Sequence, residues 1–238
     1  EAITCANDEA RKMFVEAYGH MLNYNHEQAI ACFMKCTESD PNCAMAWWGI
    51  AYCLSSSYNW SAGLGPGYDA IQQAISVKDG CSELEQDLIM ALSTRHTKEA
   101  RDNANPAALN MGNSPELNQA FADAMAPLYE KYSGNLDVTA IYVEALMNLN
   151  PWTLWNKDAS TGEITPVDDS TLMLIKIMED AFESSDEAKV HPALCHLYCH
   201  ALELSPFPER ALPAADVLRT LMPGCGHLVH MPSHIDAW

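Results

Sequence analysis

Apolar residues recur at three- and four-residue spacing along most of the chain, which is the period of one face of an α-helix. Alternation of apolar and polar residues, the pattern of a half-buried strand, is not sustained in any segment. The pattern therefore predicts an all-α protein without a sheet. The helices expected from it cover residues 8–22, 26–38, 43–57, 67–78, 83–97, 114–132, 135–148, 169–184, 192–204 and 208–221.

Two segments interrupt the helical pattern. Residues 102–113 are polar and predict a loop, and residues 150–168 hold two prolines, a glycine and two tryptophans, Trp152 and Trp155. Proline and glycine break helices, so the second segment is also expected to be a loop. A loop with two tryptophans is expected to pack on the protein, either as a cover over a site or as a plain connector.

A helix–turn–helix frame occurs more than once. Residues 29–41 match the second half of the tetratricopeptide pattern, with Cys36 in place of its second alanine, and residues 45–52 match the first half. Residues 211–223 repeat the second-half frame. Small residues stand where paired helices approach closely, and a proline ends each pair. This frame predicts a tetratricopeptide-like α-solenoid of antiparallel helix pairs, as one domain over residues 1–238.

The composition of the chain limits the classes of partner that it can bind. The chain of 238 residues holds 13 basic and 32 acidic residues, a formal net charge of −19. Such a chain repels phosphate, which argues against nucleic acid and against anionic membrane surfaces. A hydrophobic fraction of 48% argues against general disorder, and no apolar run is long enough for a membrane span. A protein or peptide partner, or self-association, is the expectation.

The ends and the cysteines bear on where the protein works. The chain opens on Glu1 rather than Met and stops at Trp238, so we expect it to be part of a longer protein. Nine cysteines and a sequon at Asn59 favour a secreted or other oxidising compartment, with the cytoplasm as the alternative. Most cysteines are expected to pack in the core. The alternative is one or two disulfides among Cys5, Cys43, Cys53, Cys81 and Cys225.

Histidines are concentrated near the end of the chain. Two clusters, each containing a His-x3-His pair, are formed by His191, His196 and His200, and by His227, His230 and His234. A His-x3-His pair puts two imidazoles on one helical face, one turn apart, where both can bind one metal ion. Glu203, one further turn along from His200, is either a carboxylate ligand or a group that orients a ligand.

The repeat frame brings the two clusters together. Residues 192–204 would be the first helix of one pair, and residues from about 227 would begin the first helix of the next; such helices stack side by side. All six histidines are therefore candidate metal ligands, with Glu203 and His26 as possible additions. His20 and His96 are interpreted as ordinary surface or core residues. The alternative to a metal site is a metal-free polar network.

The donor set restricts the metal. Many imidazoles with at most one carboxylate suit copper or zinc, and a contribution from Glu203 would also suit iron. Two triplets could hold one or two ions. A nearby thiolate from Cys195, Cys199 or Cys225 would favour zinc or copper(I). Pro232 is expected to interrupt the second triplet, with a new helix starting near Met231.

Several motifs also carry a family resemblance. They are Asn25-His26-Glu27-Gln28-Ala29, the run from Ala44 to Ala51, Glu144 to Met147 with Pro151-Trp152, His191 through His196, His200 and Glu203 to Ala211, and above all Gly226-His227-Leu228-Val229-His230-Met231-Pro232-Ser233-His234-Ile235. With these motifs the chain resembles a widespread family of large tetratricopeptide-repeat proteins of unassigned function. The resemblance implies an α-solenoid that continues beyond the last motif. Asp236 stands where the resemblance leads us to expect tyrosine.

Two functions follow from these observations. The first is a metal-binding repeat protein with a multi-histidine site between adjacent repeats, as a metal-dependent oxidoreductase or hydrolase. In that case the loop with Trp152 and Trp155 would cap the site, and Glu203 would be the candidate base. The second is a non-enzymatic scaffold that binds proteins or stacks on its own copies, with a structural metal or a metal-free histidine network.

Overall fold

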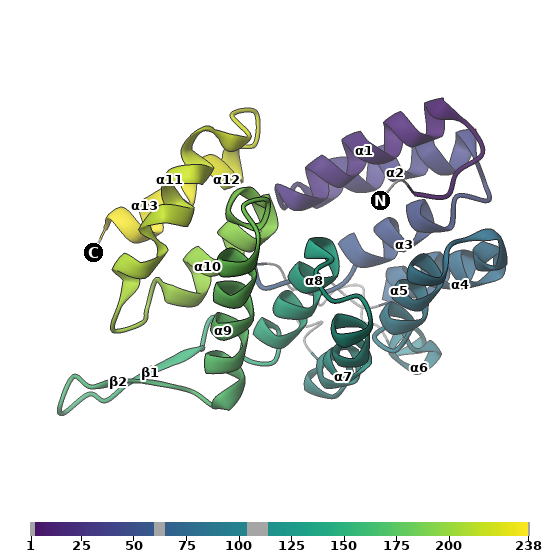
Figure 1. Ribbon diagram of the computed structural model, residues 1–238. Helices are drawn as coiled ribbons and strands as arrows, with labels where there is room; N and C mark the ends of the chain where they lie inside the picture. Colours follow the sequence, from purple (N-terminus) through teal and green to yellow (C-terminus); the bar gives the residue numbers. More distant parts are fainter. Residues whose placement is uncertain (1–2, 60–64, 104–113, 238) are drawn as a thin grey trace. The chain divides into compact units, whose positions relative to one another are not determined.

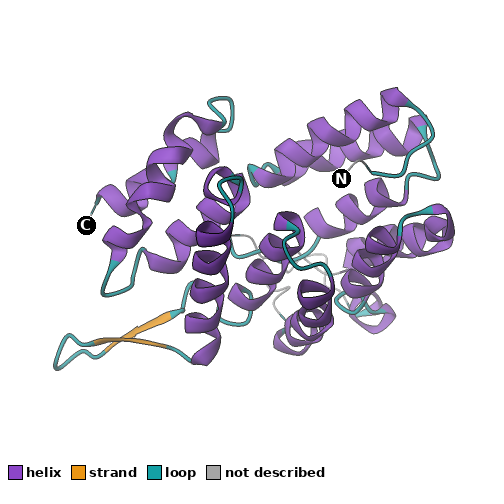
Figure 2. Ribbon diagram, viewed as in Figure 1, coloured by secondary structure: helices purple, strands orange, loops and turns teal. Residues whose placement is uncertain are grey.

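A computed structural model of the chain describes residues 3–59, 65–103 and 114–237. The predicted all-α class is confirmed, because helices make up nearly all of the regular structure in these ranges (Figures 1 and 2). Residues 104–113 of the predicted polar loop, and Trp60 and Ser61 of the sequon, lie outside the described residues. The chain divides into two units, residues 1–128 and 129–238, and each is treated separately here. One repeat domain over the whole chain stays a prediction.

The first unit is built from helices joined by short turns. They are α1 (Asp8–Leu22), α2 (His26–Ser39), α3 (Ala44–Cys53), α4 (Gly65–Val77), the 3-10 turn η1 (Lys78–Gly80), α5 (Glu83–Ser93), α6 (Lys98–Asp102) and most of α7 (Pro115–Lys131). Consecutive helices α1 to α4 pack along one another (Figure 1). Asn7 caps α1, and Ser82 and Glu85 form a capping box at α5, which satisfies backbone N–H groups that the helix ends leave open.

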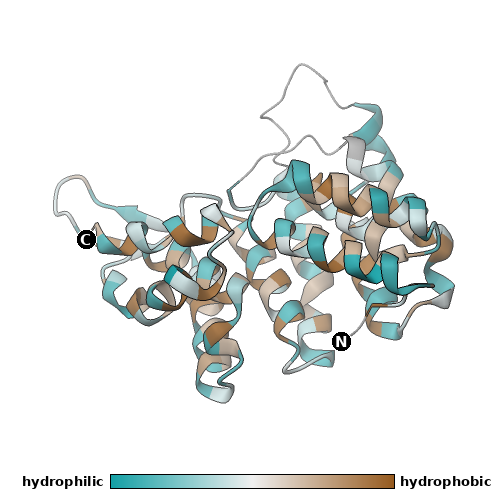
Figure 3. Ribbon diagram, turned by 90° about the horizontal axis from the view of Figure 1, so that it is seen from above, coloured by the Kyte–Doolittle hydropathy of each residue, from teal (hydrophilic) through white to brown (hydrophobic). Residues whose placement is uncertain are grey.

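Gly49, a small residue of the repeat frame, lets two helices of this unit pack closely. A Cβ atom at Gly49 would lie 2.5 Å from the ring of Phe33, so only glycine lets α3 approach α2 this closely. Phe33 and Trp48 are both buried. Figure 3 shows the underlying pattern, in which single helices carry both hydrophobic and hydrophilic residues.

The second unit carries the histidine-rich region. Its elements are α8 (Leu136–Met147), β1 (Trp155–Lys157), β2 (Ile164–Pro166), α9 (Asp169–Ser184), η2 (Ala188–Val190), α10 (Pro192–Leu202), η3 (Pro208–Ala211), α11 (Leu212–Leu221), α12 (Gly226–His230) and α13 (Pro232–Asp236). Helix α10 packs against α8, α9, α11 and α13. Its nine residues from Leu194 to Leu202 are all buried, so α10 is the centre of this unit.

One expectation about this unit is wrong. Residues 150–168 were expected to form a loop in a protein without a sheet, but β1 and β2 pair as an antiparallel hairpin (Figure 2). The turn accounts for it: Gly162 adopts a φ of 75°, and Asp158 accepts hydrogen bonds from two backbone amides of the turn at 2.8 and 2.7 Å. Gly162, which counts as evidence against a helix, is also typical of a hairpin turn.

Helix bounds follow the predicted pattern closely where helices are long. Residues 8–22 and 169–184 match α1 and α9. Residues 43–57 overshoot α3, which ends at Cys53; two residues later the Ser55 hydroxyl donates to Ala51 O at 3.0 Å. Within the described ranges no helix is both long enough and apolar enough to cross a membrane.

Candidate metal centre

Helix α10 positions two of the predicted ligands. His191 caps its start, Pro192 occupies its first turn, and His196 and His200 follow one turn apart on one face. Their ring centroids are 4.8 Å apart. His196 is 0% exposed and His200 2% exposed, so both imidazoles belong to the interior rather than to a solvated helix face.

The second histidine cluster stands on two short helices. Pro232 is in the first turn of α13, so the backbone breaks after α12, and the predicted new helix near Met231 is confirmed. His227 and His230 lie on α12 and His234 on α13. Buried Leu228, Met231 and Ile235 anchor the same segment in the apolar core.

Five imidazoles from these three helices form a closed circuit. In order around it, the ring centroids are 4.8 Å apart for His196 and His227, 4.8 Å for His227 and His230, 5.1 Å for His230 and His234, 5.2 Å for His234 and His200, and 4.8 Å for His200 and His196. We call these five residues the histidine cluster. The prediction that the two sequence clusters meet is confirmed.

Glu203 holds two members of the cluster in place. One carboxylate oxygen lies 2.8 Å from Nδ1 of His200 and the other 2.5 Å from Nδ1 of His234. Burial alone would raise the pKa of Glu203, but these hydrogen bonds lower it overall, so the carboxylate is ionised and can only accept. Both histidines therefore carry their proton on Nδ1 and turn the Nε2 lone pair away from Glu203. This is the arrangement in which a carboxylate orients metal-binding histidines.

The buried imidazoles are held in the state that binds metal. Burial, followed by the neighbouring histidines, lowers the pKa of His196 well below its ordinary value. Burial also lowers the pKa of His200, although Glu203 opposes the shift. Both rings are therefore neutral at neutral pH, and a neutral imidazole offers a lone pair to a metal ion.

Distances within the cluster suit a shared ion. Nε2 of His196 lies 3.0 Å from Nε2 of His227, and Nε2 of His230 lies 3.1 Å from Nε2 of His234. Two nitrogens bound to one ion at about 2.0 Å are about 2.8 Å apart at a right angle and about 3.3 Å at the tetrahedral angle. One ligand atom each from His196, His200 and His227 lie within 4.8 Å of one another. The donor set fits one or two ions, and the same pairs also fit N–H···N hydrogen bonds.

The segment with two tryptophans packs on the cluster. Trp155 Nε1, at the start of β1, donates to Ala201 O on α10 at 2.7 Å, which fixes the start of the hairpin. The Trp152 ring meets His200 edge-on, with centroids 5.4 Å apart, and is 49% exposed. Trp152 adopts a φ of 60°, a left-handed conformation that is unusual for so bulky a residue. This backbone places the indole against His200.

Two predicted ligands lie elsewhere. His191 accepts a backbone hydrogen bond from Leu194 at 3.4 Å, and its Nε2 lies 3.4 Å from Oδ1 of Asp137. Nothing in the sequence pattern pointed to Asp137, which stands 54 positions earlier. His26 belongs to the first unit, where its ring stacks on Tyr24 at 5.5 Å. Metal binding by these two histidines stays a prediction.

The cysteines near the histidine cluster favour packing over ligation. All nine lie within the described residues and are free thiols, and six are buried. Burial raises the pKa of Cys195 to about 12 and that of Cys199 to about 12, so both stay protonated at neutral pH. A protonated thiol is a poor metal ligand. The nitrogen donors therefore define the site.

The residue that departs from the family motif has a clear contact. Asp236 on α13 receives two hydrogen bonds from the Arg219 guanidinium, at 2.9 and 2.7 Å. Arg219 lies on α11. This bidentate pair ties α13 to α11.

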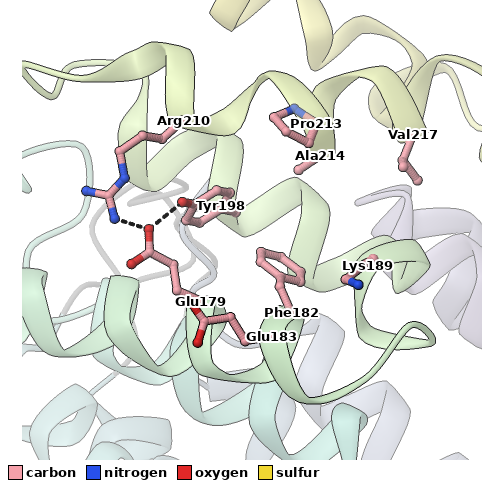
Figure 4. A pocket seen from close by; sticks show the side chains of 9 residues that line it. All are labelled: Glu179, Phe182, Glu183, Lys189, Tyr198, Arg210, Pro213, Ala214 and Val217. Atoms are coloured by element: carbon pink, nitrogen blue, oxygen red, sulfur yellow. Dashed lines mark hydrogen bonds and ion pairs between the residues drawn. The ribbon is translucent and has the colours of Figure 1, made fainter.

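The second unit also contains a cleft of about 540 Å³ between α9, α10 and α11 (Figure 4). At one end Glu179 accepts a hydrogen bond from Tyr198 at 2.6 Å and pairs with Arg210. The rest of the lining is mainly apolar and consists of Phe182, Pro213, Ala214 and Val217. Glu183 and Lys189 also line the cleft.

Comparison of the chain with protein-family models, with curated proteins and with solved structures found no significant match. The resemblance to the tetratricopeptide-repeat family therefore stays an expectation. What the structure itself supplies is an all-α fold and a histidine cluster that could hold metal.

Proposed function

We propose that the protein binds one or two transition-metal ions at the histidine cluster, within a tetratricopeptide-like repeat array. The observation that carries this proposal is the closed circuit of five imidazoles, to which α10, α12 and α13 all contribute. A core that only had to pack would gain nothing from five polar rings, since each buried imidazole needs a polar partner.

Copper or zinc is the preferred ion. The cluster offers imidazole nitrogens, and its one carboxylate is engaged through both oxygens with Nδ1 atoms, which leaves little for the oxygen-rich coordination that iron favours. A bound ion of this kind would supply Lewis-acid chemistry or, as copper, electron transfer. Because each oxygen of Glu203 is engaged with an Nδ1–H group, its part is to hold His200 and His234 rather than to remove a proton from water. This favours an oxidoreductase over a hydrolase.

The solvent exposure of the cluster residues supports a functional metal site. His230 is exposed, and His227 and His234 are half-buried, while His196 and His200 form the closed floor. The exposed edge at His230 leaves the cluster accessible from solvent, as an open coordination position requires.

Direct metal measurement tests the proposal. Purified protein, stripped with chelator, would be titrated with Cu²⁺ and with Zn²⁺ against a competing chelator, and bound metal counted by elemental analysis. We expect one or two equivalents at the histidine cluster of the wild type, a loss of at least tenfold in the affinity of the cluster for His196→Gln and His200→Ala, and no change for His26→Ala. Absence of binding, or equal binding by His200→Ala, would contradict the proposal.

A scaffold function is the second candidate, and the cleft in Figure 4 is what favours it. Repeat proteins bind peptides in grooves between helices, and such a partner could be another protein or another copy of this chain. Sedimentation of the protein with and without metal would separate the two candidates. Assembly that persists in chelator, together with wild-type assembly by His200→Ala, would favour a scaffold independent of the cluster.

A further inference from the structure

A second group of metal-binding side chains lies in the first unit, on the face where α1 meets α2. Glu16 and His20 stand one turn apart on α1, and Cys32 lies on α2. One ligand atom from each of these three residues lies within 4.8 Å of the other two. No role for His20 is predicted from the sequence, because its partner Cys32 comes from a different helix.

The three residues supply three different kinds of donor. An imidazole nitrogen, a thiolate sulfur and a carboxylate oxygen are all ligands that Zn²⁺ accepts in proteins. A thiolate and a carboxylate together balance the two positive charges of such an ion, so the loaded group would be neutral. Gln28 Nε2 also donates to the Cys32 sulfur at 3.5 Å, a contact that stabilises negative charge on sulfur.

Burial matches a site that opens to solvent. Cys32 is 3% exposed, His20 is half-buried and Glu16 is exposed. The sulfur would form the fixed floor, and the other two ligands would close over the ion. Around a tetrahedral ion these donors are about 3.3–3.6 Å apart, so closing from separations of at most 4.8 Å takes a movement of no more than about 1.5 Å by the two side chains of α1.

We propose that Glu16, His20 and Cys32 form a binding site for one divalent transition-metal ion of the zinc class, separate from the histidine cluster. Binding would release the Cys32 thiol proton to solvent as the sulfur–metal bond forms, and no oxidant or reductant takes part. Three protein ligands leave a fourth position for water.

Cobalt(II) is the probe that separates this site from the histidine cluster. A thiolate bound to Co²⁺ produces a charge-transfer absorption band in the near ultraviolet, and nitrogen-only ligation does not. Chelator-treated, fully reduced full-length chain would be titrated with CoCl₂ in a non-thiol reductant. We expect the band to saturate near one equivalent in the wild type, to be absent in Cys32→Ser, and to need at least tenfold more Co²⁺ in His20→Ala.

Two single variants serve as controls, and a double variant of α1 provides a further test. Cys5→Ser, a half-buried cysteine of the same unit, and His200→Ala should both keep the band. If Cys32→Ser folds poorly, Glu16→Gln combined with His20→Ala changes only α1 residues that solvent reaches, and we expect it to lose the band at wild-type saturating Co²⁺. A wild type without the band, or a band that persists in Cys32→Ser or in the double variant, would overturn the site. If Co²⁺ failed to bind the nitrogen ligands while the thiolate band was present, the result would contradict only the proposal for the histidine cluster.

Discussion

Nε2 of His196 lies 3.0 Å from Nε2 of His227, although 31 positions and an intervening helix, α11, separate the two residues in the chain. One of these nitrogens is buried with α10 and the other reaches it from α12. At this separation the pair shares either a proton or a metal ion. The metal alternative leads to the following expectations.

The first expectation concerns stability. Because α10, α12 and α13 bring the ligands together only in the folded chain, metal should bind the native state and raise the free energy of unfolding by mass action. At a free concentration one hundred times the dissociation constant, the gain is about 2.7 kcal/mol. Melting temperatures of wild type with metal and with chelator would measure it. The difference should shrink in His200→Ala and keep its wild-type size in His26→Ala; an undiminished difference in His200→Ala would exclude the cluster as its source.

A second expectation concerns Glu203. Glutamine has one acceptor oxygen for the two Nδ1–H groups of His200 and His234, so Glu203→Gln leaves one of them unsupported. Loss of such an orienting carboxylate lowers metal affinity about 10- to 100-fold. Competition titration would measure the affinity, with Glu209→Gln, an exposed residue nearby in the chain, as the matched control. Equal affinities for both variants would show that the carboxylate does not orient the ligands.

Trp152 should report the occupancy of the cluster. Its ring centroid is 5.4 Å from that of His200, and Cu²⁺ bound to that imidazole would quench the indole fluorescence at such short range. We expect Cu²⁺ to lower the fluorescence emission of the wild type. The part of the emission that Cu²⁺ quenches should be absent in Trp152→Phe. Trp47→Phe, a change in the first unit, should leave the quenching intact. Full quenching in Trp152→Phe would place the copper elsewhere.

The metal-free protein should lose stability as the pH falls. Burial lowers the pKa values of His196 and His200 below 6.5 in the folded state, so at pH values below about 6.5 the unfolded chain binds protons that the folded chain does not. Their stabilising contribution is therefore complete above about pH 6.5 and is lost toward lower pH, by at most about 1.4 kcal/mol per pH unit for each histidine. The lowered pKa of Glu203 adds a further loss only at lower pH, below the ordinary range of a carboxyl group.

Urea denaturation in chelator at pH 7.5, 6.5 and 5.5 would measure this dependence. Fewer negative charges at low pH also reduce repulsion in a chain of net charge −19, so the comparison with His196→Gln is the decisive quantity. The stability of His196→Gln should fall less steeply than that of the wild type. Parallel curves would show that His196 titrates alike in the folded and unfolded chains.

The sequence allowed the fold class and the core of the site to be predicted, because both rest on helical spacing. His196 and His200 share a face at any helical geometry, and the repeat frame predicted that their helix meets the one carrying His227. Pro232 was sufficient to predict the break between α12 and α13.

The remaining features depend on contacts that no local spacing encodes. His191 shares the sequence cluster, but it caps α10 and meets Asp137, since its place before Pro192 puts it outside the helix. The hairpin escaped prediction because its strands have three residues each, too few to show alternation. Which nitrogen of His200 faces Glu203 follows from three-dimensional packing alone.

The shortness of α12 and α13 has a consequence for the release of a bound metal ion. At five residues each, they are far below the length at which a helix persists by itself, so their structure depends on contacts with α10 and α11. Brief detachment of this end would break the circuit while the rest of the unit stays folded, as local openings generally do. Such openings would offer a bound ion a route of release without global unfolding. The pair between Arg219 and Asp236 is one of the contacts that oppose them.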